Sequence, residues 1–276
     1  MYASRQIARF AVVALVAVSL AGCDIAVNGD GGLHFDVSAG KAQDEWTRSY
    51  RVPASGRLEI INVNGKITAV PSDTGSIEIR AERSAKGATD DGAKELLARI
   101  EMREEIGEGR VRVEVRAPRI NGPSRHEIKW TIKVPRGVAV DLRTVNGGVK
   151  MDGLEGEIRA RSTNGGITGT GLIATGIDAA VTNGGVEIDL AKAITSGTFD
   201  IEAVNGGVTF NMPADSQADL SGRCVNGGVS VTGLEVEKIG EETRRRMDAK
   251  LNGGGARVSL ETTNGGVKFG RSGGTT

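Results

Sequence analysis

The chain has 276 residues, and its 35 basic and 35 acidic side chains cancel to a formal net charge of zero. This balance argues against a protein that holds nucleic acid through an excess of positive charge. Glycine supplies 41 residues without a Gly-X-Y period, which excludes collagen, and aromatic residues make up only 3%. We therefore expect many tight turns and a core of small and branched aliphatic side chains.

The first 22 residues have the features of an export signal. Arg5 and Arg9 precede an apolar run over residues 10–20, which is too short to cross a hydrocarbon core of about 30 Å. The run ends in Leu20-Ala21-Gly22-Cys23, which resembles the lipobox of bacterial lipoproteins. The resemblance implies cleavage before Cys23, a diacylglycerol on its thiol, and a membrane anchor. The alternatives are an ordinary signal peptide that happens to meet a cysteine, or a buried helix.

After the signal, residues 23–45 predict a lipidated cysteine and a flexible tether, because residues 28–32 read Asn-Gly-Asp-Gly-Gly. The β-repeat domain is expected over 46–276. Its first part contains one helix start signal, Thr89 followed by two aspartates, which predicts a short helix near 90–99. Alternating apolar residues between turn signals predict strands over 58–61, 66–70, 76–82, 100–106, 110–116 and 127–134.

From residue 140 onward a motif of the form Thr/Val-Asn-Gly-Gly-Val/Ile returns about every 20 residues, a period that is typical of stacked repeats. Apolar and polar residues alternate on both sides of each Asn. Each repeat is therefore predicted to be a strand, a turn and a strand with one face buried. A weaker copy comes early in the chain, and a degenerate one lies at 252–255. The asparagines of the clear copies and of the early copy are Asn64, Asn146, Asn164, Asn183, Asn205, Asn226 and Asn264.

Two all-β architectures suit such repeats. Asn-Gly is a strong hairpin signal, which would give an up-and-down antiparallel meander. The alternative is a β-solenoid, in which each repeat is one coil stacked on the last. We favour the β-solenoid, because residues two, four and six positions before each Asn keep matched sizes, as expected when they stack about 4.8 Å apart. The asparagines would then form a ladder of side-chain amides, with glycine at each corner.

One late repeat is enlarged by an insertion near 235–250. Val236, Ile239, Thr243 and Met247 stand at helical spacing there. The insertion is predicted to be a short helix or a flap that lies on the solenoid. Its charged residues are interpreted as a solvated face.

The sequence offers few groups for catalysis or metal binding. It has two histidines, His34 in the tether and His126 before a strand, and no Cys/His cluster for zinc. It has no nucleophile elbow and no phosphate-binding loop. Cys224 falls in an inward position and is expected to be a buried, inert thiol. We therefore predict no catalytic residue, no metal site and no cofactor.

The best enzyme-like feature is a file of carboxylates. Asp178 and Asp200 are predicted to occupy the same outward position in adjacent coils. Glu187, Asp189, Glu202, Arg159 and Arg161 are expected nearby. Such groups could cut an acidic polysaccharide, by analogy with some parallel β-helix enzymes. The simpler interpretation is a solvated face of mixed charge that keeps the sheet soluble.

Several of these features occur together in one known family. Arg57-Leu58-Glu59-Ile60 leads into Val63-Asn64-Gly65-Lys66-Ile67, then a helix-bearing excursion, then serial Asn-Gly-Gly-Val units. Over about residues 46–270 this pattern resembles the bacterial putative-adhesin β-repeat family, a domain family of unknown function related to adhesin-head and toast-rack-type domains. The resemblance implies a β-solenoid that is exported to the cell envelope.

The sequence thus predicts a non-enzymatic, lipid-anchored protein of the bacterial cell envelope. Its partners would be a membrane, through Cys23, and an envelope protein or glycan, with no nucleic acid. A scaffolding role fits equally, and inner and outer membranes both remain open. The alternative is an enzyme that acts on envelope polysaccharide through Asp178 and Asp200.

Overall fold

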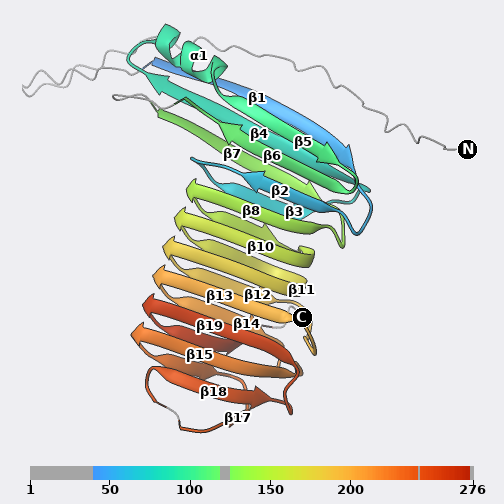
Figure 1. The fold of residues 1–276 in the computed structure, drawn as a ribbon, viewed down its shortest axis with the longest axis vertical. Helices are drawn as coiled ribbons and strands as arrows, with labels where there is room; N and C mark the ends of the chain where they lie inside the picture. The colour runs from blue at the N-terminus through green and yellow to red at the C-terminus, as the bar shows by residue number, and fades with distance from the viewer. Residues whose placement is uncertain (1–39, 119–124, 242, 274–276) are drawn as a thin grey trace, which may run out of the picture.

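The computed structural model describes residues 40–118, 125–241 and 243–273, which form an all-β structure with one short helix (Figure 1). No helix in these ranges is long and apolar enough to cross a membrane. Cys23 lies outside the described residues. The elements are β1 Gly40–Arg51, β2 Arg57–Ile61, β3 Ile67–Pro71, β4 Ser76–Gly87, α1 Asp90–Ala98, β5 Glu101–Gly107, β6 Arg110–Arg116, β7 Arg125–Val134, β8 Ala139–Asn146, β9 Val149–Asp152, β10 Glu155–Asn164, β11 Ile167–Asn183, β12 Val186–Leu190, β13 Thr198–Asn205, β14 Val208–Met212, β15 Ala218–Asn226, β16 Val229–Thr232, β17 Val236–Lys238, β18 Arg246–Leu251, β19 Ala256–Asn264 and β20 Val267–Arg271.

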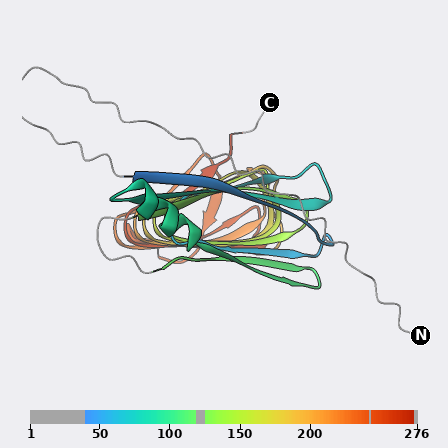
Figure 2. The same ribbon diagram turned by 90° about the horizontal axis from the view of Figure 1, so that it is seen from above.

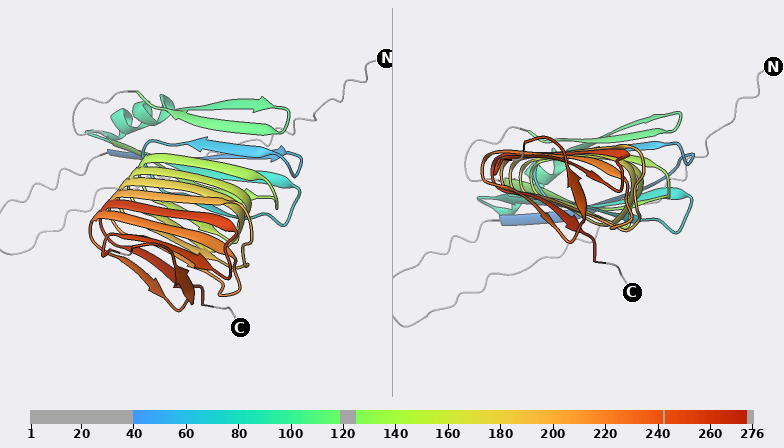
Figure 3. Two further views of the ribbon diagram at one scale, coloured as in Figure 1. Left: turned by 60° about the horizontal axis from the view of Figure 1, so that its bottom comes forward. Right: turned by 90° about the horizontal axis from the view of Figure 1, so that it is seen from below.

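The strands form two walls that face each other across the core (Figure 2). Sheet A has the order β1-β4-β7-β3-β9-β11-β12-β14-β20-β16. Sheet B has the order β5-β6-β2-β8-β10-β11-β13-β19-β15-β18-β17. Strand β11 belongs to both sheets because it is 17 residues long and bends from one wall to the other. Viewed from below, the repeats outline a flattened coil (Figure 3).

Alternating side chains fill the space between the walls. The largest fully buried side chains include Trp130, Phe199, Phe210 and Phe269. Phe199 of sheet B meets Phe210 of sheet A edge to face, with 5.6 Å between the ring centroids. The large aromatic side chains therefore fill the space between the two sheets, and the rest of the core is mainly aliphatic.

The repeats stack in parallel and in register. In sheet B, for example, Ile158 lies between Val140 and Ile177, and Ile177 lies next to Phe199. The matching strands of sheet A are also parallel. The antiparallel meander is therefore wrong for the Asn-Gly-Gly repeats, because a two-residue hairpin turn would have paired each strand with the next in the opposite direction.

The order of the repeats in space differs from their order in the chain. The last repeat, β19 and β20, lies between β13 and β15 in sheet B and between β14 and β16 in sheet A. The cause is the insertion: β18 runs antiparallel along the outer edge of β15, so the returning chain enters on the inner side. A simple stack in chain order did not predict this exchange.

The insertion itself is built from strands. Strands β17 and β18 form an antiparallel pair, and the helix considered for this segment does not occur in its described residues. Met247 is buried because alternate side chains of β18 point into the core. Its helical spacing from Val236 is therefore a coincidence. The degenerate copy at 252–255 is a turn: Asn252 has a φ of 48°, and its amide binds the carbonyl oxygens of Ala214 and Ser216.

The N-terminal part follows the expected elements with two differences. Helix α1 is capped by the hydroxyl of Thr89, which accepts a hydrogen bond from the backbone of Gly92 at 3.1 Å. Strand β4 extends to Gly87, and β1 begins at Gly40. Strand β1 therefore begins six residues before the expected boundary at 46, because β1 pairs with β4 along its full length.

Candidate functional site

Seven asparagines meet along one corner of the stack and form a continuous amide ladder. From the end of the stack towards the N-terminal region, Nδ2 of each Asn donates to Oδ1 of the next at 2.7 to 2.9 Å. All donors point the same way, so neighbouring amide dipoles reinforce one another. The members of the amide ladder in spatial order are Asn226, Asn264, Asn205, Asn183, Asn164, Asn146 and Asn64.

His126 ends the amide ladder. Nδ2 of Asn64 lies 3.2 Å from Nε2 of His126, and because an amide nitrogen only donates, Nε2 must be the acceptor. The proton of the neutral ring then sits on Nδ1, which is buried without a partner among the described residues. Burial lowers the pKa of His126 below its usual value, which favours this neutral form. The residue is thus part of the frame rather than a general base.

Each Asn is followed by a glycine that the stacking requires. A Cβ added to Gly165 would lie 2.4 Å from the carbonyl oxygen of Gly147 in the neighbouring repeat, and its φ is 140°. The repeats approach so closely at this corner because Gly147 donates its backbone N–H to the carbonyl of Asn164 at 2.8 Å. The Asn-Gly pair therefore serves the architecture, and the chemistry of the molecule must be sought on the flat faces.

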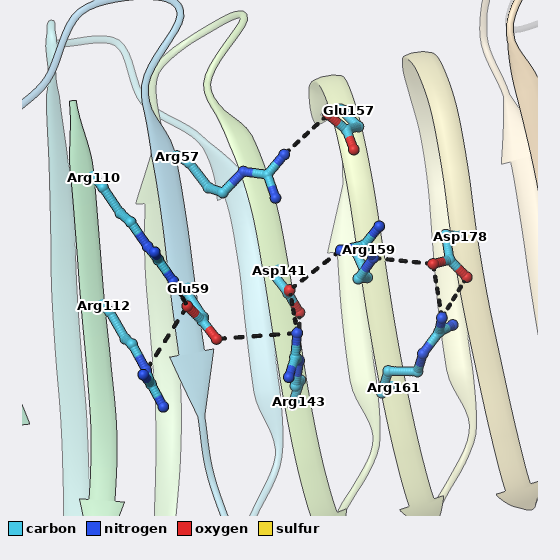
Figure 4. Close-up of polar contacts among 10 residues, drawn as sticks. All are labelled: Arg57, Glu59, Arg110, Arg112, Asp141, Arg143, Glu157, Arg159, Arg161 and Asp178. Carbon is cyan, nitrogen blue, oxygen red and sulfur yellow. Dashed lines mark hydrogen bonds and ion pairs between the residues drawn. The ribbon is translucent and has the colours of Figure 1, made fainter.

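The outer face of sheet B carries two carboxylates that are buried under arginines (Figure 4). Glu59 on β2 and Asp141 on β8 are register neighbours, with side chains 8% and 6% exposed. Glu59 accepts a hydrogen bond from Arg110 at 2.6 Å and lies within 4.0 Å of Arg112 and Arg143. Burial of a charge at this depth requires such compensation by opposite charges.

Asp141 continues the same network along the sheet. It accepts two hydrogen bonds from Arg143, at 2.6 and 2.8 Å, and lies 3.9 Å from Arg159. Arg159 in turn donates to Asp178 at 3.0 Å, and Arg161 donates to the same carboxylate at 2.7 Å (Figure 4). The hydrogen bond to Asp141 raises the pKa of Arg143, so its guanidinium stays charged. Ion pairs therefore link five adjacent strands, from β6 to β11.

The expected carboxylate file is only partly assembled. Asp178 and Asp200 are register neighbours on β11 and β13. Burial and then the nearby charge of Asp178 raise the pKa of Asp200. Glu187 and Asp189, expected close by, lie on β12 in sheet A and hence on the opposite wall.

This arrangement gives little support to acid–base chemistry. Asp178 is bound by two guanidinium groups, so its carboxylate oxygens are engaged in ion pairs and are not placed to act on a substrate. Within the described ranges, no group of three or more His, Cys, Asp or Glu side chains could hold a metal ion. Cys224 is a buried free thiol.

An open groove of about 650 Å³ runs beside this network. It follows the positions one to three residues before each Asn, from β8 to β15. Arg161 lines the groove and also binds Asp178, so the charged network and the groove form one continuous surface. Side chains that point outward along the groove include Arg161, Glu202, Arg223, Glu261, Thr163, Thr182, Thr263, Val204 and Val225.

Sequence reasoning missed Glu59, Asp141 and Arg143 as members of this surface. Asp141 and Arg143 fall at polar positions of the alternating pattern, where residues are usually solvated, and Glu59 was given no role. The available signal was the order of charges at one repeat position, where Asp141, Arg159 and Asp178 alternate in sign. Alternation of sign between stacked neighbours predicts ion pairs across strands.

No family model matches the sequence, and no curated protein matches it either. A putative cell adhesion protein from Clostridium sporogenes has a solved structure with 14% identity and a TM-score of 0.49, over 83% of this chain and 100% of that one. A putative adhesin from Bacteroides fragilis matches with 11% identity and a TM-score of 0.34, over 82% and 97%. A putative lipid binding protein from Parabacteroides distasonis matches with 11% identity and a TM-score of 0.27, over 82% and 96%. At these levels the likeness assigns no activity to this chain.

Proposed function

We propose that this protein is a non-enzymatic, lipid-anchored component of the bacterial cell envelope. Its stacked repeats form a β-solenoid that presents the outer face of sheet B to an envelope protein or glycan. One observation carries the binding role: polar groups on this face are fixed in place by buried ion pairs. A pre-organised surface loses less conformational entropy when it binds a partner than a mobile one does.

The location of the fixed groups supports binding rather than stability alone. Exposed ion pairs contribute about 0 to 1 kcal/mol, and burying a pair is often no better than apolar packing. Glu59 and Asp141 are nevertheless buried, although they lie on the outer face of sheet B. Holding arginine side chains in a defined array is a use that accounts for this arrangement.

Binding is tested with the full-length protein in detergent micelles, presented to glycan arrays and to envelope extracts. We expect retention of a glycan or protein that is lost when the outer face of sheet B is altered and kept when the outer face of sheet A is altered. Equal loss from both alterations would contradict the proposal.

The anchor is tested separately through Cys23. Cells that express the wild-type chain should incorporate labelled palmitate into it and retain it in the membrane fraction. The Cys23→Ala chain should do neither. A Cys23→Ala protein that still takes up palmitate would exclude the lipobox interpretation.

One observation favours the enzyme alternative. Burial and then the neighbouring Asp178 raise the pKa of Asp200, which favours a carboxyl that holds a proton. An enzyme that acts on envelope polysaccharide should lose its turnover in the Asp178→Ala/Asp200→Ala protein while the protein stays folded. Unchanged turnover in that variant would remove both carboxylates from the mechanism.

A further inference from the structure

The geometry points to an anionic polysaccharide as the ligand of sheet B, bound along a row of arginines. This inference rests on the proposed binding role and names its ligand class. The arginine row consists of the six outward arginines on the network of Figure 4, namely Arg110, Arg112, Arg57, Arg143, Arg159 and Arg161.

The first argument is the difference in exposure between acids and bases. The side chains of Glu59 and Asp141 are 8% and 6% exposed, whereas those of Arg110 and Arg143 are 58% and 43% exposed. Over β2 and β8 the carboxylates of Glu59 and Asp141 thus lie beneath the guanidinium groups, whereas Glu157 and Asp178 are about as exposed as the arginines they pair with. A partner that approaches this part of the face meets hydrogen-bond donors with positive charge, although the chain as a whole is neutral.

The second argument is the number of donors left over. A guanidinium group has five N–H donors. Arg143 directs Nε and Nη2 to Asp141, and Arg110 directs one Nη to Glu59. Among the described residues, their remaining N–H groups make no hydrogen bond and can bind carboxylate, sulfate or phosphate oxygens, which arginine recognises in bidentate geometry.

The third argument is the shape of the surface. The arginine row crosses strands β6, β2, β8 and β10, which are successive neighbours, so at about 4.8 Å per strand it extends for roughly 14 Å along the stack. It continues through Arg161 into the near end of the groove, where Thr163 and Thr182 add hydroxyl groups, and it stops short of Glu202 and Glu261, which line the farther part. A linear chain that carries both anionic groups and hydroxyls fits this surface.

Other partners fit less well. Stable protein interfaces have a core enriched in aromatic and apolar side chains, and the groove contains no aromatic residue. Nucleic acid is disfavoured by the zero net charge. A lipid surface would have to lie against the side of the stack, because the arginine row follows its long axis (Figures 1 and 4).

The test measures binding of polygalacturonate and of dextran sulfate to the full-length protein in uncharged detergent. The altered protein carries Arg110→Gln and Arg161→Gln. Glu59 then keeps Arg112 and Arg143, and Asp178 keeps Arg159, so both carboxylates retain a partner. The matched control carries Arg80→Gln and Arg271→Gln, which remove two exposed arginines from sheet A, away from the groove.

We expect at least one of the two polyanions to bind, with an affinity that falls as salt rises because counterions are released. The Arg110→Gln/Arg161→Gln protein should bind that polyanion at least about tenfold more weakly, because each substitution removes charge-assisted hydrogen bonds to the ligand. The control protein should bind like the wild type, and the methyl ester of polygalacturonate, which lacks the charge, should not bind. Should the altered protein fail to fold, the salt dependence and the methyl ester still decide the question.

The inference fails if neither polyanion binds, if the methyl ester binds equally well, or if the control protein loses as much affinity. It also fails if phosphatidylglycerol vesicles bind more tightly through the same arginines, because the ligand would then be a lipid surface. If envelope extracts contain a partner that binds the wild type and the Arg110→Gln/Arg161→Gln protein equally, the proposed function stands and the arginine row is not its site. If nothing in those extracts binds the wild type, both the proposed binding function and the arginine row as its site are excluded.

Discussion

The repeat region, residues 139–271, and the N-terminal region, residues 40–134, extend the same two sheets with different pairing. Between β8 and β20 most neighbouring strands are parallel, and identical side chains lie over one another at the corner. In the N-terminal region β1, β4 and β7 are antiparallel, as are β5 and β6, and α1 packs beside β1 and β4.

The two regions therefore fix their register by different means. The repeats depend on glycine corners and on the amide ladder, which act between neighbours. The N-terminal region depends on long antiparallel ladders, and single contacts tie its two edge strands together, where Arg48 and Tyr50 of β1 bind Glu104 of β5 at 3.0 and 2.6 Å. One region distributes its restraints over many equivalent sites, and the other concentrates them.

The largest expected effect comes from a glycine corner. Gly165→Ala should destabilise the protein by about 3 kcal/mol or more, because it adds backbone strain and a Cβ against a carbonyl of the next repeat. Gly107→Ala, on the edge strand β5, is the control, since a Cβ there has no neighbour within 4 Å. Denaturant unfolding should show a large shift for the first and almost none for the second. Equal shifts would mean that the corners do not control stability.

A smaller effect is expected where the N-terminal region concentrates its contacts. Tyr50→Phe removes the hydrogen bond to Glu104 and should cost about 1.5 kcal/mol, since the acceptor is charged and partly buried. Burial and Glu104 raise the pKa of Tyr50, so the wild type keeps this contribution below about pH 10 and loses it as pH rises further. The Phe variant should lack that alkaline loss in a pH series of unfolding midpoints. An unchanged alkaline loss would show that Tyr50 does not cause it.

Removal of one rung of the amide ladder should have a smaller effect again. Asn183→Ala removes the hydrogen bonds to Asn164 and Asn205, and the cost should be about 1 kcal/mol because the exposed partners can bind water. Asn226→Ala, at the end of the ladder, removes only the bond to Asn264 and should cost about half as much. Equal costs for the two positions would show that the amide bonds themselves contribute little.

The sequence could predict the features of the repeats that depend on local pattern, but not the choice of neighbouring strand. The position of each Asn, the inward column and the parallel stacking follow from alternation and period, which are local properties. The insertion of β19 between β13 and β15 could not be predicted, because it depends on which edge of β15 the segment β17–β18 covers. Local pattern specifies that a repeat will stack and leaves open the neighbour it stacks on.

The outer face was harder to predict than the core. An inward position is recognised by its apolar side chain, whereas an outward arginine looks the same whether it is solvated or paired. Only the register in three dimensions brings Glu59 next to Asp141 on one side and Arg112 on the other, across strands far apart in the chain. The N-terminal strands β6 and β7 return beside β2 and β3, which no repeat predicts.

The smallest expected effect lies where the two regions join, at His126. Its pKa is lowered by burial, so the neutral ring contributes stability that is complete above its ordinary pKa of about 6.5 and is lost as pH falls through the lower folded value. Protonation would also remove the Nε2 acceptor of Asn64 and free the end of the amide ladder. His126→Gln supplies a neutral side chain, so the difference in unfolding free energy between wild type and variant should change by about 0.5 kcal/mol between pH 7 and pH 5. Because the acidic residues titrate alike in both proteins, this difference isolates His126, and a difference that stays constant with pH would show that the ladder does not depend on its charge.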